Sequence, residues 1–467
     1  MAEYESVDFF TDESLNEDPY PYFDHLRSQC PILPTTHHGV LAVSGYEEAS
    51  EIYLNNEDFS SCNSVVGPFA TFPVPLEGDD VSAIIDGNRE VLPMYEHMVT
   101  MDPPQHTQER ALIMRLLTPK RLKENEAFMW RLADRQIDEF VAVGHCEFIK
   151  AYTQPFAMLV VADVLGVPES DHERFREGFG LSGTPGKLGT ETQGMSSNAL
   201  HWLDEYFARY IEDRRGNPRG DVLTDLALAT YPDGSTPDVT NLVRTATFLF
   251  AAGQETTARL LAVGVKYLSE YPELQDELRA HKDRIPGFIE EALRIESPVK
   301  ADFRLCRRHV EVGGVDIAPG TPVMLLNGAA NRDPRRFGAP DAFRPARYGP
   351  AAPDSPPISF GAGAHFCLGA ALAQLEGAVA FPRLLARFPE MVPAGDPVRR
   401  PRLLLRGHAT PPGSGASRTR AGAVWAAGPG HPPGSSRETG PAAAGTRRRL
   451  RAGPERHRGR NGRPRQS

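Results

Sequence analysis

The sequence predicts a mainly α-helical protein with small β-sheets. Residues 238–270 follow one helical pattern that is apolar in its middle, and further helical patterns cover residues 46–54 and 107–143. Strand-like alternation is confined to short runs at residues 39–43 and 309–326. Helical segments therefore greatly outnumber strands, and we find no internal repeat.

Three segments have the composition of loops. Residues 61–100 are rich in Gly, Pro and Asp and predict a long irregular segment, and such loops in compact domains are usually functional or disordered. Residues 166–197 are rich in Gly, Ser and Thr and predict a mobile lid. The run Ala318-Pro319-Gly320 predicts a turn between the strand-like segments of residues 309–326.

Composition limits the kinds of partner. The chain has 467 residues, 40% of them hydrophobic, which allows a large core. Its net charge of −10 is unevenly spread, because residues 413–467 carry twelve Arg and two Glu, a net +10, which leaves about −20 on the rest. An acidic body argues against nucleic acid as the main partner.

Cysteine usage and hydropathy indicate where the protein works. The five cysteines are odd in number and form no Cys-x-x-Cys pair, which fits a reducing cytoplasm better than a disulfide framework. The acidic N-terminus lacks the apolar core of a signal peptide, and no apolar run approaches the roughly 20 residues of a membrane span. We therefore expect a cytoplasmic monomer without a membrane partner.

The segment at residues 411–467 differs from the rest of the chain. Gly, Ala, Pro and Arg supply 38 of the 55 residues from 413 to 467, without apolar periodicity, so this tail is predicted to be disordered. GC-rich codons encode these four residues. We therefore interpret residues 1–410 as the folded domain and the tail as the product of a shifted reading frame, with a native Arg-rich interaction tail as the alternative.

The most informative segment is the decapeptide FGAGAHFCLG, residues 360–369. Its glycines allow a tight loop that approaches a flat cofactor closely, and the helical stretch behind it would point backbone N–H groups toward Cys367. A free cysteine is usually a small buried hydrophobe, but a thiolate in such a loop suits an axial haem ligand. The pattern Phe-Gly-x-Gly-x-His-x-Cys-x-Gly resembles the haem-binding motif of the cytochrome P450 family, and the resemblance covers roughly residues 10–410.

This resemblance implies the cytochrome P450 fold, with haem b (iron protoporphyrin IX) between the long central helix and the Cys loop. It implies Cys367 as the iron ligand, Phe360, Gly361 and Gly369 as loop residues around the cofactor, and Ala252 as a contact from the long helix. One departure follows the Cys, since the family usually shows Leu-Ala-Arg-x-Glu and this chain reads LAQLE at residues 372–376. We expect the lost Arg to alter local packing or surface charge without touching the iron ligand.

The long helix carries an acid followed by an alcohol, Glu255-Thr256, shortly after Gly253. A Gly costs about 1 kcal/mol relative to Ala in a helix interior, and a Thr can bond back to an earlier carbonyl. The residues alone would thus fit a kinked core helix with a solvated Glu. The segment also resembles the family's Ala/Gly-Gly-x-Asp/Glu-Thr-Thr motif, which implies that Thr256 hydrogen-bonds to oxygen bound at the iron while Glu255 supplies protons from solvent.

A charged pair lies at Glu291 and Arg294, three residues apart on one helix face. Such pairs are common on surfaces and worth only a few tenths of a kcal/mol. The resemblance to the family's Glu-x-x-Arg motif instead implies a buried ion pair that Arg347 completes. These three residues would determine the fold and take no part in catalysis.

Two haem propionates would need cationic or hydrogen-bonding partners. His106 and Arg110 lie four residues apart after Asp-Pro-Pro and resemble the family's His-x-x-x-Arg propionate clamp. Arg304 and His365 complete the set that the resemblance implies. Each of the four, taken alone, reads as a surface charge.

Together the motifs imply a bacterial-type haem-thiolate monooxygenase, which inserts one atom of O2 into a small apolar organic substrate by hydroxylation or epoxidation. Electrons would come from NAD(P)H through a separate ferredoxin reductase and ferredoxin, because the chain shows no flavin or iron–sulfur motif. Arg115, Lys120 and Arg121 are candidate ferredoxin contacts, or else they only solvate a helix end.

The substrate pocket is expected to be apolar with few polar anchors. The resemblance places in its wall Phe248, Ala252, Thr256, the loop at residues 61–100, and residues 299–303 from Val299 to Phe303. Terpenes, steroids, fatty acids, aromatics and polyketides all fit such a pocket.

Three alternative functions stay open. A peroxide-driven enzyme of the same fold usually lacks the acid–alcohol pair, so Glu255-Thr256 argues against it. A nitric oxide reductase would take hydride directly from NAD(P)H. A haem-binding sensor or an inactive scaffold would have no need of proton delivery.

Overall fold

The computed structural model describes residue 4 and residues 6–114, 116–175, 201–231, 233–349 and 356–393. All of these belong to one unit, Met1–Gly428, whereas the second unit, Pro429–Ser467, lies outside the described residues. The tail predicted at residues 411–467 and residues 176–197 of the predicted lid also lie outside them.

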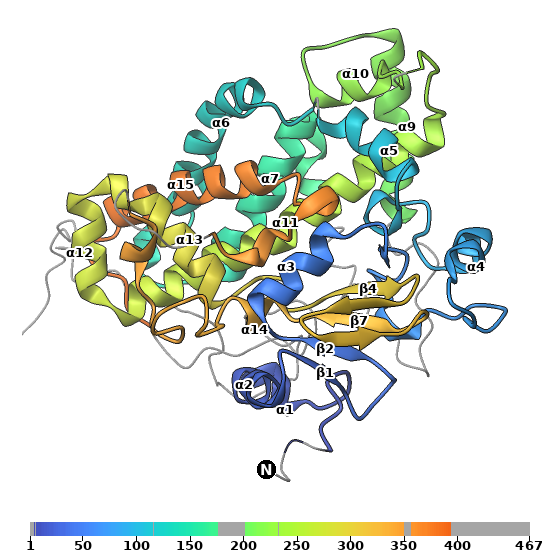
Figure 1. The fold of residues 1–467 in the computed structure, drawn as a ribbon. Coiled ribbons are helices and arrows are strands. Elements are labelled where there is room, and N and C mark those ends of the chain that lie inside the picture. Colours follow the sequence, from blue (N-terminus) through green and yellow to red (C-terminus); the bar gives the residue numbers. More distant parts are fainter. Residues whose placement is uncertain are drawn as a thin grey trace, which may run out of the picture. The chain divides into compact units, whose positions relative to one another are not determined.

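The long helix predicted at residues 238–270 is confirmed as α11, Val239–Glu270. Asp238 caps its start, because its carboxylate accepts a hydrogen bond of 2.9 Å from the backbone N–H of Asn241. The helix packs against α7 (Gln154–Leu165), α9 (His201–Gly216), α13 (Ile285–Ile295) and α15 (Ala370–Arg387), as Figure 1 shows. A Cβ on Gly253 would come within 2.7 Å of Val161 on α7, so this glycine serves close helix packing.

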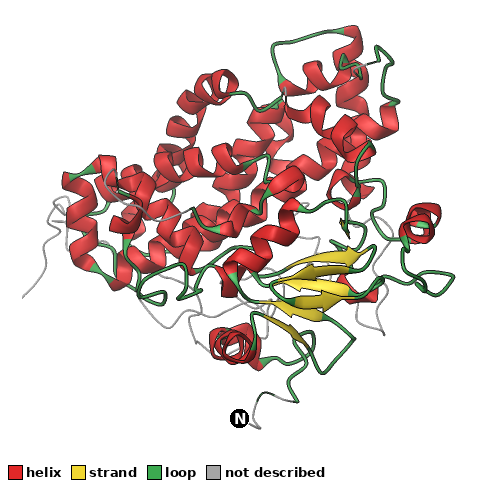
Figure 2. Cartoon of the chain, viewed as in Figure 1, coloured by secondary structure: helices red, strands yellow, loops and turns green. Residues whose placement is uncertain are grey.

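Helices dominate the described residues, and the predicted fold class is confirmed (Figure 2). The helix predicted at residues 46–54 is α3, Tyr46–Leu54, and the pattern at residues 107–143 divides into α5, Gln105–Met114, and α6, Pro119–Asp138. The remaining helices are α1 (Ser14–Glu17), α2 (Tyr20–Gln29), α4 (Ser82–Gly87), α10 (Val222–Ala227), α12 (Pro272–Ala280) and α14 (Asn327–Ala330). No helix within the described residues combines the length and the apolar character that a membrane crossing requires.

A five-stranded sheet with the strand order β1-β2-β7-β4-β3 lies between α2 and α3. Its strands are β1 (Ile32–Pro34), β2 (Leu41–Val43), β7 (Pro322–Leu325), β4 (Asp302–Cys306) and β3 (Phe59–Ser60), and only the β2–β7 pairing is parallel. Successive side chains of a strand face opposite sides. Accordingly Leu41 and Val43 pack in the cluster of α3, whereas Ala42 packs with α2 on the other side.

The structure corrects one expectation and adds a turn to another. The loop at residues 61–100 is not irregular throughout, because it contains α4 and packs Ile85 and Leu92 into a buried cluster with Leu305 of β4. In residues 309–326, the hairpin of β5 (Val310–Val312) and β6 (Val315–Ile317) turns at Gly313-Gly314, both with positive φ. The predicted turn at Ala318-Pro319-Gly320 is confirmed, and it connects β6 with β7 of the larger sheet.

Candidate active site

The Cys loop leads from residue 358 into the start of α15. Two short 3-10 turns, Ile358–Phe360 and Gly363–His365, fold it back on itself, and the backbone N–H of Cys367 donates to the carbonyl of Phe360 at 2.9 Å. Gly363 has a φ of +67°, and a Cβ there would come within 2.5 Å of the carbonyl oxygen of Tyr53. Only glycine fits this position, so the loop is fixed against α3.

Cys367 is the only exposed cysteine of the five, all of which lie within the described residues. Gly361 has a φ of +66°, and Gly369 has only the Cys367 sulfur, at 4.0 Å, near the place where a Cβ would lie. Although the residue is exposed, desolvation raises the pKa of its thiol, while the backbone N–H of Gly369 and the Arg110 guanidinium oppose that shift. The Phe360 and Phe366 rings flank the loop, with centroids 6.3 Å apart.

The predicted propionate partners come together beside this loop. The His106 ring on α5 and the His365 ring lie with centroids 3.9 Å apart, and Arg110 Nη2 donates to the carbonyl of Phe366 at 2.6 Å. His106 is only 1% exposed, and neither ring nitrogen has a hydrogen-bond partner within the described residues. One nitrogen of a neutral imidazole carries a hydrogen, and a buried N–H without a partner is a group that a carboxylate ligand would satisfy.

Burial and neighbouring cations keep both histidines neutral. Burial and the Arg110 guanidinium lower the pKa of His106 to about 4. Burial, and after it the Arg304 guanidinium, lower the pKa of His365 to about 2. The positive charge of the site therefore belongs to the two arginines, and a thiol beside a cationic cluster is a donor set that fits haem b with its propionates.

Arg304 is buried in β4 and has protein partners of its own. Its Nη1 donates to the Phe303 carbonyl at 2.6 Å and to Ser64 Oγ at 3.2 Å. Its guanidinium lies 3.3 Å from the Asp302 carboxylate and 5.1 Å from the centre of the Tyr53 ring. These contacts fix the guanidinium close enough to lower the pKa of both site histidines.

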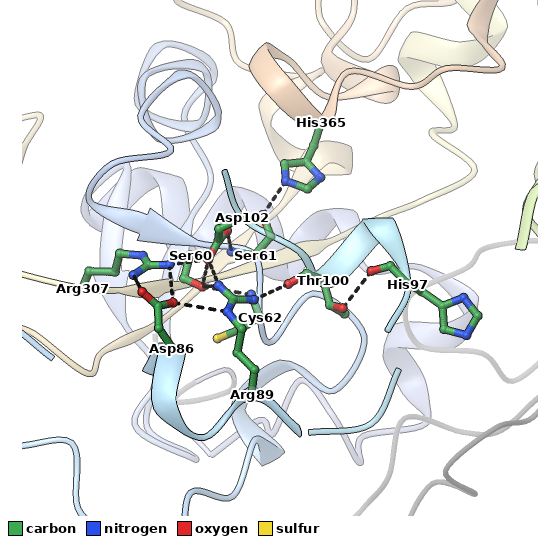
Figure 3. Close-up of polar contacts among 10 residues, drawn as sticks. All are labelled: Ser60, Ser61, Cys62, Asp86, Arg89, His97, Thr100, Asp102, Arg307 and His365. Atoms are coloured by element: carbon green, nitrogen blue, oxygen red, sulfur yellow. Dashed lines mark hydrogen bonds and ion pairs between the residues drawn. The ribbon is translucent and has the colours of Figure 1, made fainter. Parts of the chain in front are cut away.

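Sequence reasoning missed the carboxylate that organises this site, Asp102 (Figure 3). The residue is 4% exposed and accepts hydrogen bonds from the Ser61 N–H at 2.8 Å and from Arg307 Nη2 at 2.5 Å. Ser60 and Arg89 donate to the same carboxylate. Burial alone would raise the pKa of Asp102, but Arg89, Ser60 and the other donors hold it below its ordinary value.

The Asp102 cluster, which consists of Asp102, Ser60, Ser61, Arg89 and Arg307, reaches the Cys loop. Ser61 Oγ lies 3.0 Å from His365 Nε2, so the carboxylate positions one of the histidines through a single serine. The Asp-Pro-Pro sequence before His106 could have drawn attention to Asp102. Its two arginines are 13 and 205 residues away along the chain, where no spacing rule reaches.

On α11 the predicted acid and alcohol each have a partner within the helix. Thr256 Oγ1 donates to the Ala252 carbonyl at 3.0 Å, and Arg259 Nη2 donates to Glu255 Oε1 at 2.5 Å. Ala252 and Thr256 are one turn apart and therefore share a face of the helix. The Glu255–Arg259 pair is at i and i+4, a spacing from which the sequence could have predicted it.

Behind the Cys loop, Glu291 and Arg294 form a buried pair on α13. Arg294 donates to both carboxylate oxygens, at 2.7 and 2.9 Å, and Arg347 Nε lies 3.2 Å from Glu291 Oε1. The backbone N–H of Arg344 adds a bond of 2.7 Å to the same carboxylate. The three predicted residues therefore form one network that ties α13 to residues 344–347.

The other predicted residues are more scattered. Phe248 lines a recess between α5, α11 and the end of the loop at residues 61–100, whereas Ala252, Thr256 and Val299 are not among the residues of its wall. Val299 is half-buried before β4. At the start of α6, Lys120 is 87% exposed and lies 3.8 Å from Glu124, and Arg121 pairs with Asp225 at 2.5 Å. Arg115 lies outside the described residues.

Known proteins resemble both the sequence and the fold. The family model described as cytochrome P450 matches residues 184–414. Cytochrome P450 144 of Mycobacterium tuberculosis is 34% identical over 81% of this chain and 84% of that protein, and cytochrome P450 monooxygenase PikC of Streptomyces venezuelae is 31% identical over 84% and 89%. The structure of substrate-free CYP150A6 of Mycobacterium marinum superposes with a TM-score of 0.79 at 52% identity, covering 87% of this chain and 97% of that one.

The matches to the two relatives and to the solved structure extend over more than four fifths of the chain, and they agree with the fold, with the Cys loop and with the donor set beside it. The chain belongs to the cytochrome P450 family, as a monooxygenase whose cofactor is haem b.

Proposed function

We propose that this P450 inserts one oxygen atom of O2 into a small, mainly apolar organic substrate, by hydroxylation or epoxidation. Electrons come from NAD(P)H through a ferredoxin reductase and a ferredoxin. The observation that carries the proposal is the exposed Cys367 beside the His106–His365 pair and Arg110. The enzyme acts as a cytoplasmic monomer without nucleic acid or membrane partners.

Each group of the site has a defined part in holding the cofactor. Cys367 would ligate the iron, and Phe360, Gly361, Gly369 and Ala252 would contact the macrocycle. His106, Arg110, Arg304 and His365 hold the propionates, for which the two histidines supply neutral N–H groups and the two arginines supply charge. Haem bound through a thiolate supplies the activation of O2, because the thiolate pushes electron density that favours O–O cleavage.

The residues of α11 deliver protons. The Thr256 hydroxyl donates its proton to the Ala252 carbonyl. A rotation of this hydroxyl group about one bond turns the proton away from the carbonyl and outward from the helix face on which Ala252 and Thr256 both lie. Glu255 is held by Arg259, so it must exchange this partner for solvent when it passes a proton on. We therefore assign to Thr256 the role of a hydrogen-bond donor and to Glu255 the role of a proton carrier.

An apolar substrate and a ferredoxin partner have separate support. Phe248 presents an aromatic ring to the recess beside α11. A similar protein, CYP109E1 of Bacillus megaterium (25% identity, TM-score 0.72), has been solved in complex with corticosterone, and a mainly apolar multi-ring molecule is thus one class to test.

Lys120, exposed at the start of α6, is a cation that an acidic ferredoxin could contact, and such contacts govern the rate of association.

The test compares the Thr256→Ala and Thr256→Ser variants after the reduced, carbon-monoxide-bound spectrum has established thiolate ligation. The alanine variant is expected to consume O2 and release hydrogen peroxide without forming product, because the hydroxyl donor is gone. The serine variant retains the hydroxyl and should stay coupled. Equal coupling in the wild type and both variants would refute the role of Thr256.

Two further measurements separate the alternative functions. Full turnover with hydrogen peroxide and no NAD(P)H would identify a peroxide-driven enzyme. Consumption of nitric oxide with NAD(P)H alone would identify a reductase that needs no ferredoxin.

A further inference from the structure

Two adjacent serines at the end of β3 contact different parts of the site. Ser60 donates to the Asp102 carboxylate, whereas Ser61 lies against the Cys loop, with its Oγ 3.0 Å from Nε2 of His365 (Figure 3). Ser61 is 0% exposed, and its backbone N–H donates to Asp102 at 2.8 Å. The Asp102 carboxylate therefore fixes the backbone from which the Ser61 hydroxyl reaches the imidazole.

The hydrogen bond between Ser61 and His365 can run in two directions. Within the described residues, Ser61 Oγ has no other hydrogen-bond partner. Burial and the Arg304 guanidinium lower the pKa of His365 and so favour the neutral ring. A neutral imidazole carries hydrogen on one nitrogen and accepts at the other, while a hydroxyl group can donate and accept. The direction of the bond therefore decides which nitrogen of His365 carries the hydrogen.

The two directions differ in the groups that they leave unsatisfied. If Ser61 donates to Nε2, the hydroxyl hydrogen and the Nε2 lone pair satisfy each other, and the ring hydrogen is on Nδ1. If Nε2 donates instead, the hydroxyl hydrogen is buried without an acceptor among the described residues. A buried donor without an acceptor costs about 1–3 kcal/mol, so donation by Ser61 is favoured.

The direction also decides what His365 presents to a carboxylate. An Nδ1 that carries hydrogen can donate to a carboxylate oxygen, whereas a bare Nδ1 would oppose its lone pair to that oxygen. The ring of His106 lies beside that of His365, with centroids 3.9 Å apart, but neither of its nitrogens has a hydrogen-bond partner in the described part of the chain. A hydroxyl group therefore orients only one of the two site histidines.

We propose that Ser61 is a positioning residue for the cofactor, because its hydroxyl donates to His365 Nε2 and keeps the ring hydrogen on Nδ1, available to a haem propionate. The proposal rests on the proposed function, since it specifies how one of the assigned propionate partners becomes a hydrogen-bond donor. The start of the loop at residues 61–100, which was expected in the wall of the substrate pocket, then helps to hold the cofactor.

Neutron diffraction from crystals of the perdeuterated, haem-loaded protein locates these hydrogens directly. Deuterium is expected on Nδ1 of His365, and on Ser61 Oγ in the direction of Nε2. Deuterium on Nε2, whether alone or together with Nδ1, would overturn the inference. This measurement uses the wild type, so it gives an answer even where a substitution prevents folding.

The rate of haem transfer to an excess of apomyoglobin measures the consequence in solution. Ser61→Ala removes the donor and should speed haem loss by roughly threefold to tenfold, the effect of one net hydrogen bond. Ser359→Ala is the matched control, because the Ser359 hydroxyl of the same Cys loop bonds to the Leu293 carbonyl and to Asn331, each at 2.7 Å, and to no assigned propionate partner. Urea unfolding of both variants measures the general loss of stability.

An unchanged rate in Ser61→Ala, or an equal increase in both variants, would contradict the role of Ser61. The inference and the proposed function fail in different measurements. A thiolate band and oxidised product together with deuterium on Nε2 would refute only the role of Ser61. Deuterium on Nδ1 in a protein that forms no oxidised product would refute only the proposed function.

Discussion

Two glutamates on neighbouring helices show two ways to bury a carboxyl group. Glu291 on α13 and Glu376 on α15 are both 0% exposed. Glu291 accepts hydrogen bonds from Arg294 and from the backbone N–H of Arg344, with Arg347 as a second cation. Neither carboxyl oxygen of Glu376 has a hydrogen-bond partner within the described residues.

The difference teaches that burial alone does not define the state of an acid. Burial raises the pKa of Glu376 well above its ordinary value, so the group is held as a neutral carboxylic acid. Its neighbour Tyr152 is also fully buried without a partner for its hydroxyl within the described residues, and burial followed by the Asp134 carboxylate raises the pKa of that phenol as well. We call Glu291 a compensated charge, because arginines neutralise its carboxylate. We call Glu376 a suppressed charge, because its carboxyl group keeps its proton.

The largest expected effect comes from breaking the compensated pair. Glu291→Ala leaves Arg294 buried without its carboxylate and removes one anion from Arg347, and removing one partner of a buried pair costs about 3–5 kcal/mol of unfolding free energy. Urea unfolding followed by circular dichroism measures this cost. Because Glu291 lies behind the Cys loop, we also expect less haem-loaded protein.

Glu376→Ala is the matched variant on α15. It leaves no charge without a partner, so it should cost only the packing of the removed atoms. Equal losses in the two alanine variants would contradict the distinction between a compensated and a suppressed charge.

A third buried carboxylate, Asp102, lies beside the Cys loop. Its substitution tests whether neutralisation by arginines also stabilises the protein there. Asp102→Asn weakens the interaction with Arg89 and Arg307, and we expect a loss of about 2–3 kcal/mol, since Arg89 is half-buried and Arg307 keeps Asp86 as a second partner. The pKa of Asp102 is lowered in the folded protein, so its stabilisation is full above the unfolded value of about 3.9 and is lost as the pH falls through the folded value. The variant should therefore lose less stability than the wild type on acidification from pH 5 to pH 3.

The same variant has a second readout at the haem. Asp102 holds Ser61, which in turn contacts His365, so Asp102→Asn should shift the reduction potential while the thiolate band is retained. Ser28→Ala provides a control at an exposed serine whose hydroxyl bonds only a local carbonyl. An unchanged potential in Asp102→Asn would limit this cluster to a role in folding.

These contrasts also mark how far the sequence could lead. The long helix α11 was predictable because its apolar pattern and its cap at Asp238 are local. Glu291 and Arg294 share a short motif, so their pairing was predictable too. The turn at Ala318-Pro319-Gly320 was predicted correctly, whereas the hairpin turn at Gly313-Gly314 was missed, because only strand pairing shows that the alternating segment also divides there.

What the sequence could not give depends on contacts between distant segments. Asp102 is bound by arginines from two other segments, and no local pattern announces that they meet. Glu376 sits in the altered LAQLE stretch, but its isolation results from packing on every side, which spacing does not report. Single conspicuous residues were thus easier to predict than their surroundings.

A smaller effect is expected from the suppressed charge, with the opposite pH dependence. The raised pKa of Glu376 means that the folded protein retains a proton which the unfolded chain releases above about pH 4.3. The wild type therefore loses stability as the pH rises, by up to about 1.4 kcal/mol between pH 5 and pH 6. Glu376→Gln keeps the shape without the proton, so its stability relative to the wild type should increase over that interval. A difference that does not change with pH would mean that Glu376 is ionised in the folded protein.

The smallest effect concerns the position where the family usually has an arginine. Gln374 Nε2 donates to Glu290 of α13, and burial, opposed by this bond, raises the pKa of Glu290. Gln374→Arg would put a cation against that carboxylate and should stabilise the protein by about 0.5 kcal/mol, as partly exposed pairs do. Residues two apart on a helix do not face each other, so the pH dependence assigned to Glu376 should not change. Gln374→Met, which has no donor, is the control and should be less stable than the wild type. The arginine variant could instead remove the pH dependence of Glu376. In that case Glu376 stays neutral in the wild type only because no cation lies near it. The difference between Glu376 and Glu291 would then depend on the residue at position 374 alone.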